Sequence, residues 1–196
     1  QNLSLHLEAK DTQEFVVNVT TNNTKPDRGY EIGSLTSNPE TIKLTGPTSL
    51  INKIDKVNAS IDVDGATEDI TTEKDVKIID KNGEEFTDSD MSYLNVSRVY
   101  VTAKLWKVQA DVKIKAGYSG SPKSGYQVES VSTTPNVVSV AGSEEGLATL
   151  KEQNNTITIP DYVADISDRD SDFEEKINIS DYLPDGLKLT SDSSED

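Results

Sequence analysis

The chain has 196 residues, of which 33% are hydrophobic and 28% are charged, and its formal net charge is −16. That length allows one large domain or two small ones. The negative charge repels phosphate backbones and anionic lipid, which argues against nucleic acid as a partner and against direct adsorption to a membrane. Because cysteine is absent, disulfides and thiolate metal sites are excluded.

The first nine residues contain an alternating segment, Leu3-Ser4-Leu5-His6-Leu7, with the period of a β-strand. We predict that residues 1–9 are either a strand like the one that closes a preceding repeat or a linker to a membrane anchor. No run of about 20 apolar residues and no signal peptide occurs in the chain, so any anchor helix is expected outside these residues.

Residues 10–105 are predicted to form a first module made mostly of short strands. Strand formers alternate with polar residues at 15–20, 41–45, 61–63 and 99–103. A short helix is predicted at 47–54, where Leu50, Ile51 and Ile54 share one face and Pro47 suits the first turn. Asn82-Gly83 favours a tight hairpin turn.

The sequence then repeats itself after 96 residues. Gly29-Tyr30 matches Gly125-Tyr126, and Pro39 matches Pro135. The apolar positions agree over residues 29–71 without a gap, which indicates a duplicated domain. We therefore predict a second module at 106–196 with strands at 108–115, 137–141 and 157–159, a helix that Ser143 can cap, and no closing strand. The expected fold class is all-β, with one short helix in each of two tandem modules.

Candidate catalytic and metal-binding residues are sparse. The single histidine, His6, lies in the predicted terminal strand, where a catalytic triad is not expected. The residues Asp168, Asp170 and Asp172 alternate as in the start of a calcium loop, but Phe173 stands where glycine is needed. We interpret this segment as a solvated acidic loop. No catalytic, cofactor-binding or metal-binding residue is assigned, the chain is predicted not to be an enzyme, and the partner interface is unknown.

Three aromatic residues have expected structural roles. Trp106 is the only tryptophan and lies where the two predicted modules meet, so we expect it to pack them together. Tyr30 and Tyr126 recur at the same place in the repeat, and both are interpreted as structural residues.

The order of these features resembles the YbbR domain of bacteria. The residues that carry the resemblance are Gly29-Tyr30, residues 39–46 and Ile61-Asp62-Val63-Asp64-Gly65, together with their partners Gly125-Tyr126, residues 135–142 and Ile157-Thr158-Ile159. The second copy departs from the Asp-Val-Asp-Gly segment, since Thr158-Ile159-Pro160-Asp161 stands there.

The resemblance implies a mostly β fold and a function in signalling. YbbR domains occur in tandem in Gram-positive proteins that are held by one N-terminal membrane helix, with the repeats outside the cell. Such proteins resemble regulators of the membrane diadenylate cyclase, which makes cyclic di-AMP. The family has no established catalytic residues to carry over. The expected protein is thus an extracytoplasmic, non-catalytic regulator that acts on the cyclase by protein–protein interaction.

One alternative remains open: a cell-surface stalk, adhesin or β-repeat protein that binds cell-wall components. A neighbouring cyclase gene would favour regulation, and a downstream cell-wall sorting signal would favour the stalk. The absence of a closing strand in the second module also predicts a strand-swapped homo-oligomer, formed when residues 3–7 of another copy pair there.

Overall fold

The computed structural model describes residues 2–193, and the chain divides into two compact units. The first comprises Gln1–Arg28 and Ser34–Leu105, and the second comprises Gly29–Gly33 and Trp106–Asp196. Two strands contribute residues to both units, namely β2 (Tyr30–Asn38) and β7 (Val99–Ala116).

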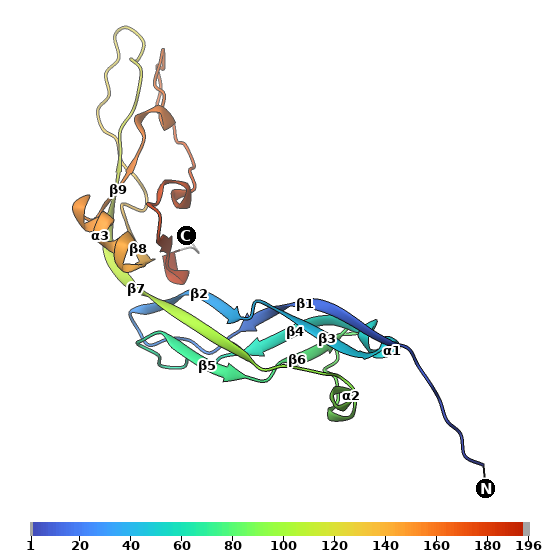
Figure 1. Cartoon of the computed structure of the whole chain (residues 1–196). Coiled ribbons are helices and arrows are strands. Elements are labelled where there is room, and N and C mark those ends of the chain that lie inside the picture. The colour runs from blue at the N-terminus through green and yellow to red at the C-terminus, as the bar shows by residue number, and fades with distance from the viewer. Residues whose placement is uncertain (1, 194–196) are drawn as a thin grey trace. The chain divides into compact units, whose positions relative to one another are not determined.

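The first unit is built on a four-stranded sheet in the order β3-β1-β4-β6 (Figure 1). Its strands are β1 (Lys10–Thr20), β3 (Thr41–Pro47), β4 (Ile54–Ser60) and β6 (Lys77–Asp80). The central strand β1 is antiparallel to β3 and parallel to β4, with the single-turn helix α1 (Thr48–Ile51) between these two in sequence. Strand β5 (Ile70–Lys74) pairs with the start of β7.

Alternating apolar residues explain why these strands bury one face. In β3, Ile42 and Leu44 are buried while Lys43 between them is exposed. Leu44, Val57 and Ile78 come from three strands of the sheet and are completely inaccessible to solvent. The core of the first unit therefore lies on one face of this sheet.

The second unit is organised around the end of β7. This strand is antiparallel to β8 (Val137–Gly142) and parallel to β9 (Thr156–Ile159), while β10 (Leu187–Leu189) pairs with β8. Helix α3 (Glu144–Glu152) connects β8 to β9 and begins at Ser143, whose side chain accepts a hydrogen bond from the Gly146 N–H. Short 3₁₀ turns lie at Asp161–Val163, Ile179–Tyr182 and Ser191–Ser193. The core cluster consists of Val112, Val138, Val140, Leu150, Ile157 and Leu187.

The predicted fold class, mainly β with few short helices, is confirmed. Several boundaries differ from the prediction. The strands expected at 99–103 and 108–115 form one strand, β7, and the strand expected at 61–63 is absent because β4 ends at Ser60. Ile61 and Val63 are nevertheless buried, so their alternation reflects burial of an irregular segment. Ile54, expected in the helix, is the first residue of β4.

Residues 2–9 form no strand, and whether residues 1–9 belong to a preceding repeat or link to an anchor stays a prediction. One further expectation differs from the structure. Tyr126 is 55% exposed, so its interpretation as a packed structural residue is wrong, whereas Tyr30 is partly buried. The first unit also contains an additional helix, α2 (Asp88–Ser92), with a capping box in which Thr87 accepts from the Asp90 N–H and Asp90 accepts from the Thr87 N–H.

Candidate functional site

The two units place corresponding strands in the same pairing register. Asp11 of β1 pairs with Gly46, and 96 residues later Lys107 of β7 pairs with Gly142. Each of these glycines lies against a leucine, because a methyl group added to Gly46 or Gly142 would come within 2.4 Å of Leu94 or Leu187 respectively. The first part of the sequence repeat is therefore also a repeat in the structure.

After the short helix of each unit, equivalent residues are no longer 96 positions apart. Val17 pairs with Val57 in the first unit, and Ile114 pairs with Ile157 in the second. Ile157 thus occupies the place of Val57, because α3 has nine residues and α1 has only four. The gap-free alignment of residues 29–71 is wrong beyond the helix, and with it the match of 157–159 to 61–63.

The segment Asp62-Val63-Asp64-Gly65 has a structural counterpart in the second unit, in a loop held by the same hydrogen bonds. We call residues 62–66 and 165–169 the Asp loops, and residues 24–28 and 119–123 the facing turns. In the first unit the Gly65 N–H donates to the Lys25 carbonyl at 3.0 Å, and the Asp27 N–H donates to the Ala66 carbonyl at 2.9 Å. The Asp62 carboxylate accepts from the Asp64 N–H at 2.9 Å, which closes a turn within the loop.

The second unit reproduces each of these hydrogen bonds. The Asp168 N–H donates to Ser121 at 3.0 Å, and the Lys123 N–H donates to Arg169 at 2.9 Å. The Asp165 carboxylate accepts from the Ser167 N–H at 2.9 Å. Asp168, at φ 57°, stands in the left-handed conformation that Gly65 adopts at φ 63°. The acidic turn is therefore present in both units, although 103 residues instead of 96 separate its copies.

The Asp loop of the second unit carries a compact set of charged groups. The Ser167 hydroxyl donates to the Asp165 carboxylate at 2.6 Å, and this bond, followed by that from the Ser167 N–H, lowers the pKa of Asp165. The Arg169 guanidinium lies 3.6 Å from the centre of the Phe173 ring, and its Nε donates to the Asp165 carbonyl. Lys123 pairs with Asp170 at 2.9 Å. The loop therefore presents ordered carboxylates and a stacked arginine to solvent.

Replacing Ser167 by alanine is expected to raise the pKa of Asp165 toward its ordinary value, because the hydroxyl donor is lost while the N–H donor remains. A lowered folded-state pKa contributes stability above the unfolded value of about 3.9, and this contribution is lost as the pH falls through the folded value. The variant should therefore lose less stability on acidification. Carbon NMR titration of the carboxyl groups measures this, with Ser171→Ala as the control, and an unchanged Asp165 titration would contradict it.

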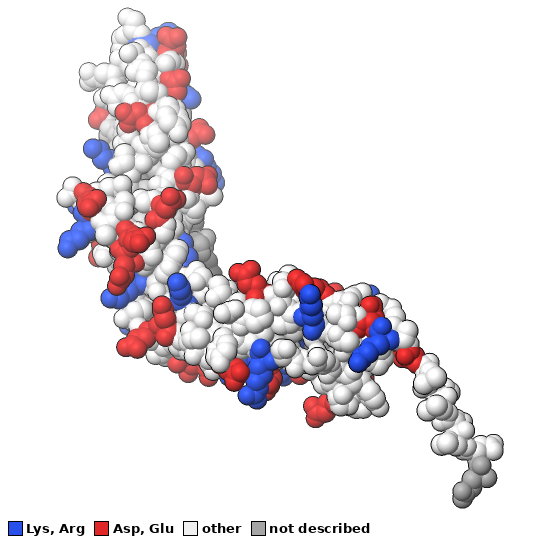
Figure 2. Space-filling view, in the orientation of Figure 1, with Lys and Arg blue, Asp and Glu red and all other residues white. Residues whose placement is uncertain are grey.

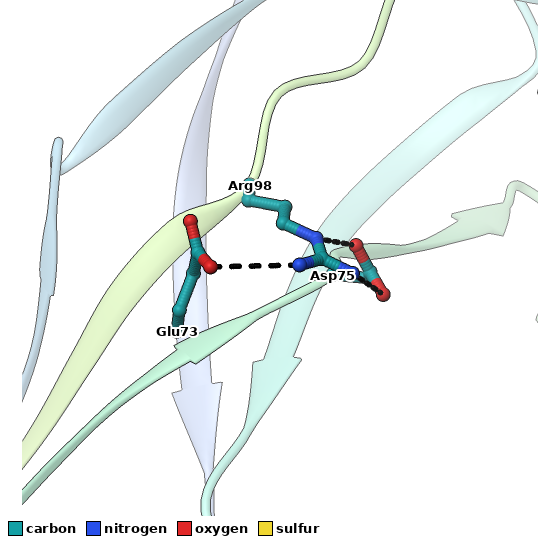
Figure 3. Close-up of polar contacts among 3 residues, drawn as sticks. All are labelled: Glu73, Asp75 and Arg98. Atoms are coloured by element: carbon teal, nitrogen blue, oxygen red, sulfur yellow. Dashed lines mark hydrogen bonds and ion pairs between the residues drawn. The ribbon is translucent and has the colours of Figure 1, made fainter.

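A second charged cluster lies in the first unit where β7 begins. Arg98 donates to Asp75 at 2.7 Å and contacts Glu73 at 3.5 Å, which joins the end of β5 to the start of β7 (Figure 3). Hydrogen bonding and charge attraction from Asp75 raise the pKa of Arg98. These side chains are largely exposed, so solvent screening makes the cluster a weak stabiliser. Its chemistry is that of a surface salt bridge.

Each of the two units has a mixed charged surface and one of the two hollows described next. Figure 2 shows acidic side chains interspersed with basic ones over both units on the face drawn. A shallow hollow of about 230 Å³ in the first unit is lined by residues that include Asn58, Lys77 and Glu85. Another, of about 310 Å³ in the second unit, is lined by residues that include Ile114, Val131 and Asn136.

The residues examined as possible catalytic or metal ligands do not converge. His6 is exposed in the irregular segment 2–9, and Asp170 is engaged with Lys123. Within residues 2–193, no group of three or more His, Cys, Asp or Glu side chains is placed to hold a metal ion. Trp106 lies in the second unit, where its ring packs on Gly33, and its expected role between modules stays a prediction. No helix in that described range is long and apolar enough to cross a membrane.

Comparison with known proteins finds a matching domain model and a similar regulatory protein. Residues 16–103 match the model for YbbR-like protein. The chain is 30% identical over 191 residues to the CdaA regulatory protein CdaR of Bacillus subtilis (strain 168), which covers 95% of this chain and 36% of that protein. The chain thus spans about a third of the length of this relative.

A solved structure of a YbbR-like protein from Streptococcus pneumoniae TIGR4 is 18% identical. The similarity covers 86% of this chain and 80% of the solved chain, with a TM-score of 0.31. The family model matches the first unit, and assignment of residues 106–196 to a second YbbR-like module stays a prediction. Residues 16–103 of this chain thus form a YbbR-like domain, and the similarity to CdaR extends over both compact units.

Proposed function

We propose that this chain is the extracytoplasmic, non-catalytic part of a membrane-anchored regulator of a diadenylate cyclase. It acts by protein–protein interaction, and an anchor helix outside these residues links it to the membrane. Control of the cyclase would change the level of cyclic di-AMP. Association of copies of the chain through residues 3–7 belongs to the same proposal.

The observation that carries this proposal is the similarity to the CdaA regulatory protein CdaR. It extends over 191 residues and therefore includes both compact units as well as the domain matched by the family model. The same relative is described as a regulatory protein, which supports a role in binding and not in chemistry.

The Asp loops are the surfaces that we assign to partner recognition. They recur in both units with the same backbone hydrogen bonds, so their shape is fixed before a partner arrives. The second loop adds Arg169 stacked on Phe173, a combination of arginine and aromatic side chains that is frequent in binding hot spots. This surface suits a protein partner better than a phosphate-rich one, because the chain is strongly acidic.

The test uses the full-length gene product, expressed with and without the diadenylate cyclase in the same cells. We expect the cyclase to co-purify with it and the cyclic di-AMP level to change when it is present. Reversing the charge of the second loop with Arg169→Glu should weaken both effects. Lys151→Glu makes the same change of charge on the exposed face of α3, outside the loop, and should leave both unchanged.

Two outcomes would contradict the proposal in different ways. If neither co-purification nor a change in cyclic di-AMP occurs, regulation of the cyclase is wrong, and binding to isolated cell walls becomes the next measurement. If the cyclase is regulated but Arg169→Glu and Lys151→Glu behave alike, the function stands and the assignment of the loop is wrong.

A further inference from the structure

Asn82 and Gly83 form the only Asn-Gly sequence in the chain. An asparagine before glycine can lose its side-chain amide spontaneously, because the following backbone nitrogen attacks the side-chain carbon and glycine has no Cβ to hinder the approach. Both residues are exposed, and no atom beyond the two chain neighbours of Gly83 lies within 4 Å of the position that a Cβ there would occupy. Side chains from elsewhere in the fold therefore do not shield this pair from solvent.

A turn between β6 and residues 84–86 holds this pair in one conformation. The Gly83 N–H donates to the Asp80 carbonyl at 2.9 Å, and the Asp80 N–H donates to the Glu84 carbonyl at 2.8 Å. Gly83 adopts φ 85°, the left-handed conformation that follows a type I turn in short hairpin loops. The nitrogen that would attack Asn82 is thus engaged in a backbone hydrogen bond.

The Asp80 carboxylate closes the same turn with its side chain. Its Oδ1 accepts from the Asn82 N–H at 2.8 Å and from the Glu84 N–H at 2.9 Å. These bonds, chiefly the one from Glu84, lower the pKa of Asp80, so the carboxylate stays charged at neutral pH. One side chain therefore joins the residues on both sides of Gly83.

We propose that Asn82 is a site of spontaneous deamidation and that the turn closed by Asp80 controls its rate. In this reaction the Gly83 nitrogen gives up its proton to solvent and bonds to Cγ of Asn82, while the Cγ–Nδ2 bond breaks and the amide takes up a proton and leaves as ammonia. Water then opens the succinimide ring at either carbonyl, which leaves aspartate or isoaspartate in place of the asparagine. Because the closed turn keeps the Gly83 N–H bonded to Asp80, the reaction requires local opening.

The products change the turn in charge and in length. Both add a negative charge next to the Asp80 carboxylate, and isoaspartate also inserts a methylene into the backbone. The bridge between Ile79 and Glu85 and the hydrogen bond from the Phe86 N–H to the Ile78 carbonyl depend on the length of this connection. Because Phe86 is buried, we expect the isoaspartate form to be less stable than the original protein.

Incubation of the protein at one pH, folded or unfolded in urea, tests the control by the turn. Peptide mapping by mass spectrometry measures deamidation at residue 82, and enzymatic methylation of isoaspartate measures that product. We expect the reaction to be at least about tenfold slower in the folded protein, because only the opened turn reacts. Asn82→Gln should abolish both signals at this residue, since the longer side chain closes a ring far more slowly.

Asp80→Ala tests the role of the carboxylate. The substitution removes both side-chain hydrogen bonds and should accelerate deamidation of the folded protein by roughly fivefold or more. Asp172→Ala makes the same change at an exposed residue of the second unit and should leave the rate unchanged. Amide hydrogen exchange at Val57 and Ile78, which pair between β4 and β6, shows that the variant stays folded. In the original protein, the exchange protection of the Gly83 amide should match the slowing of deamidation within about threefold, since both need the same opening.

Three results would overturn the proposal. The first is equal deamidation of Asn82 in the folded and the unfolded protein, or none in either. The second is an equal rate for Asp80→Ala and Asp172→Ala while the amides of Val57 and Ile78 stay protected. The third, which needs no variant, is slowing of deamidation that does not match the protection of the Gly83 amide. Because none of these measurements involves the cyclase, they stand apart from the outcome for the proposed function.

Discussion

Replacing Leu150 by alanine should lower the free energy of unfolding of the second unit by about 3 kcal/mol, within the range of about 2–5 kcal/mol for buried leucines. Leu150 is completely inaccessible to solvent and belongs to the cluster that includes Val112, Val140 and Ile157. Together with the partly buried Leu147, it packs α3 against this cluster, whose other members come mainly from β7, β8 and β9. Its truncation removes apolar contacts and leaves a cavity that the surrounding side chains can only partly fill.

Urea unfolding followed by tryptophan fluorescence measures this effect, because the single tryptophan, Trp106, belongs to the second unit. A lower midpoint with an unchanged slope is the expected result. Leu3→Ala is the matched control, since it makes the same chemical change at an exposed residue and should shift the midpoint little. Equal effects of the two substitutions would show that Leu150 does not lie in the core.

Replacing Gly146 by alanine should destabilise the second unit by about 1–2 kcal/mol, although alanine favours helix over glycine by about 1 kcal/mol. Gly146 lies in the first turn of α3, and a methyl group there would come within 2.5 Å of the Gly186 carbonyl oxygen. That oxygen cannot move without loss, because it accepts a hydrogen bond from the Ser143 N–H at 2.9 Å. Steric overlap therefore outweighs helix propensity.

Thr149→Ala separates these two contributions within the same helix. Thr149 is exposed, so its replacement reports helix propensity without a steric clash and should change stability by only a few tenths of a kcal/mol. Thermal unfolding followed by circular dichroism compares the two variants. A Gly146→Ala protein as stable as the original would mean that the loop at Gly186 does not pack against α3.

The sequence was sufficient to predict those elements that local patterns specify. Burial alternates along all of β3 and along β8 from Val137 to Val140, and Ser143 with Glu144 and Glu145 marks the start of α3, so the places of these elements were predicted closely. Helix α2 was missed although its Thr87 and Asp90 form a capping box, because its five residues contain no apolar stripe. A search for the cap alone would have found it.

The correspondence between the two Asp loops could not be predicted from the sequence. The number of residues between the facing turn and the Asp loop differs in the two units. The apolar alternation of Ile157 and Ile159 matches Ile61 and Val63 in sequence as well as it matches Val57 and Ala59 in space. Hydrogen bonds decide between these alternatives, and a pattern of apolar residues contains no information about them. The gap-free alignment therefore places residues 165–167 opposite residues 69–71, although the turn at Asp165 matches the turn at Asp62.

Because β7 is one continuous strand, it limits where the chain can be cut into fragments and where a gene duplication can begin. Leu105 and Trp106 are consecutive residues of one strand, and residues 29–33 belong to the second compact unit although they precede most of the first. No single cut of the chain yields two intact halves, so protein engineers who need a separate half must choose breakpoints inside loops and accept shared strands. By the same reasoning, a gene duplication need not start at a structural boundary.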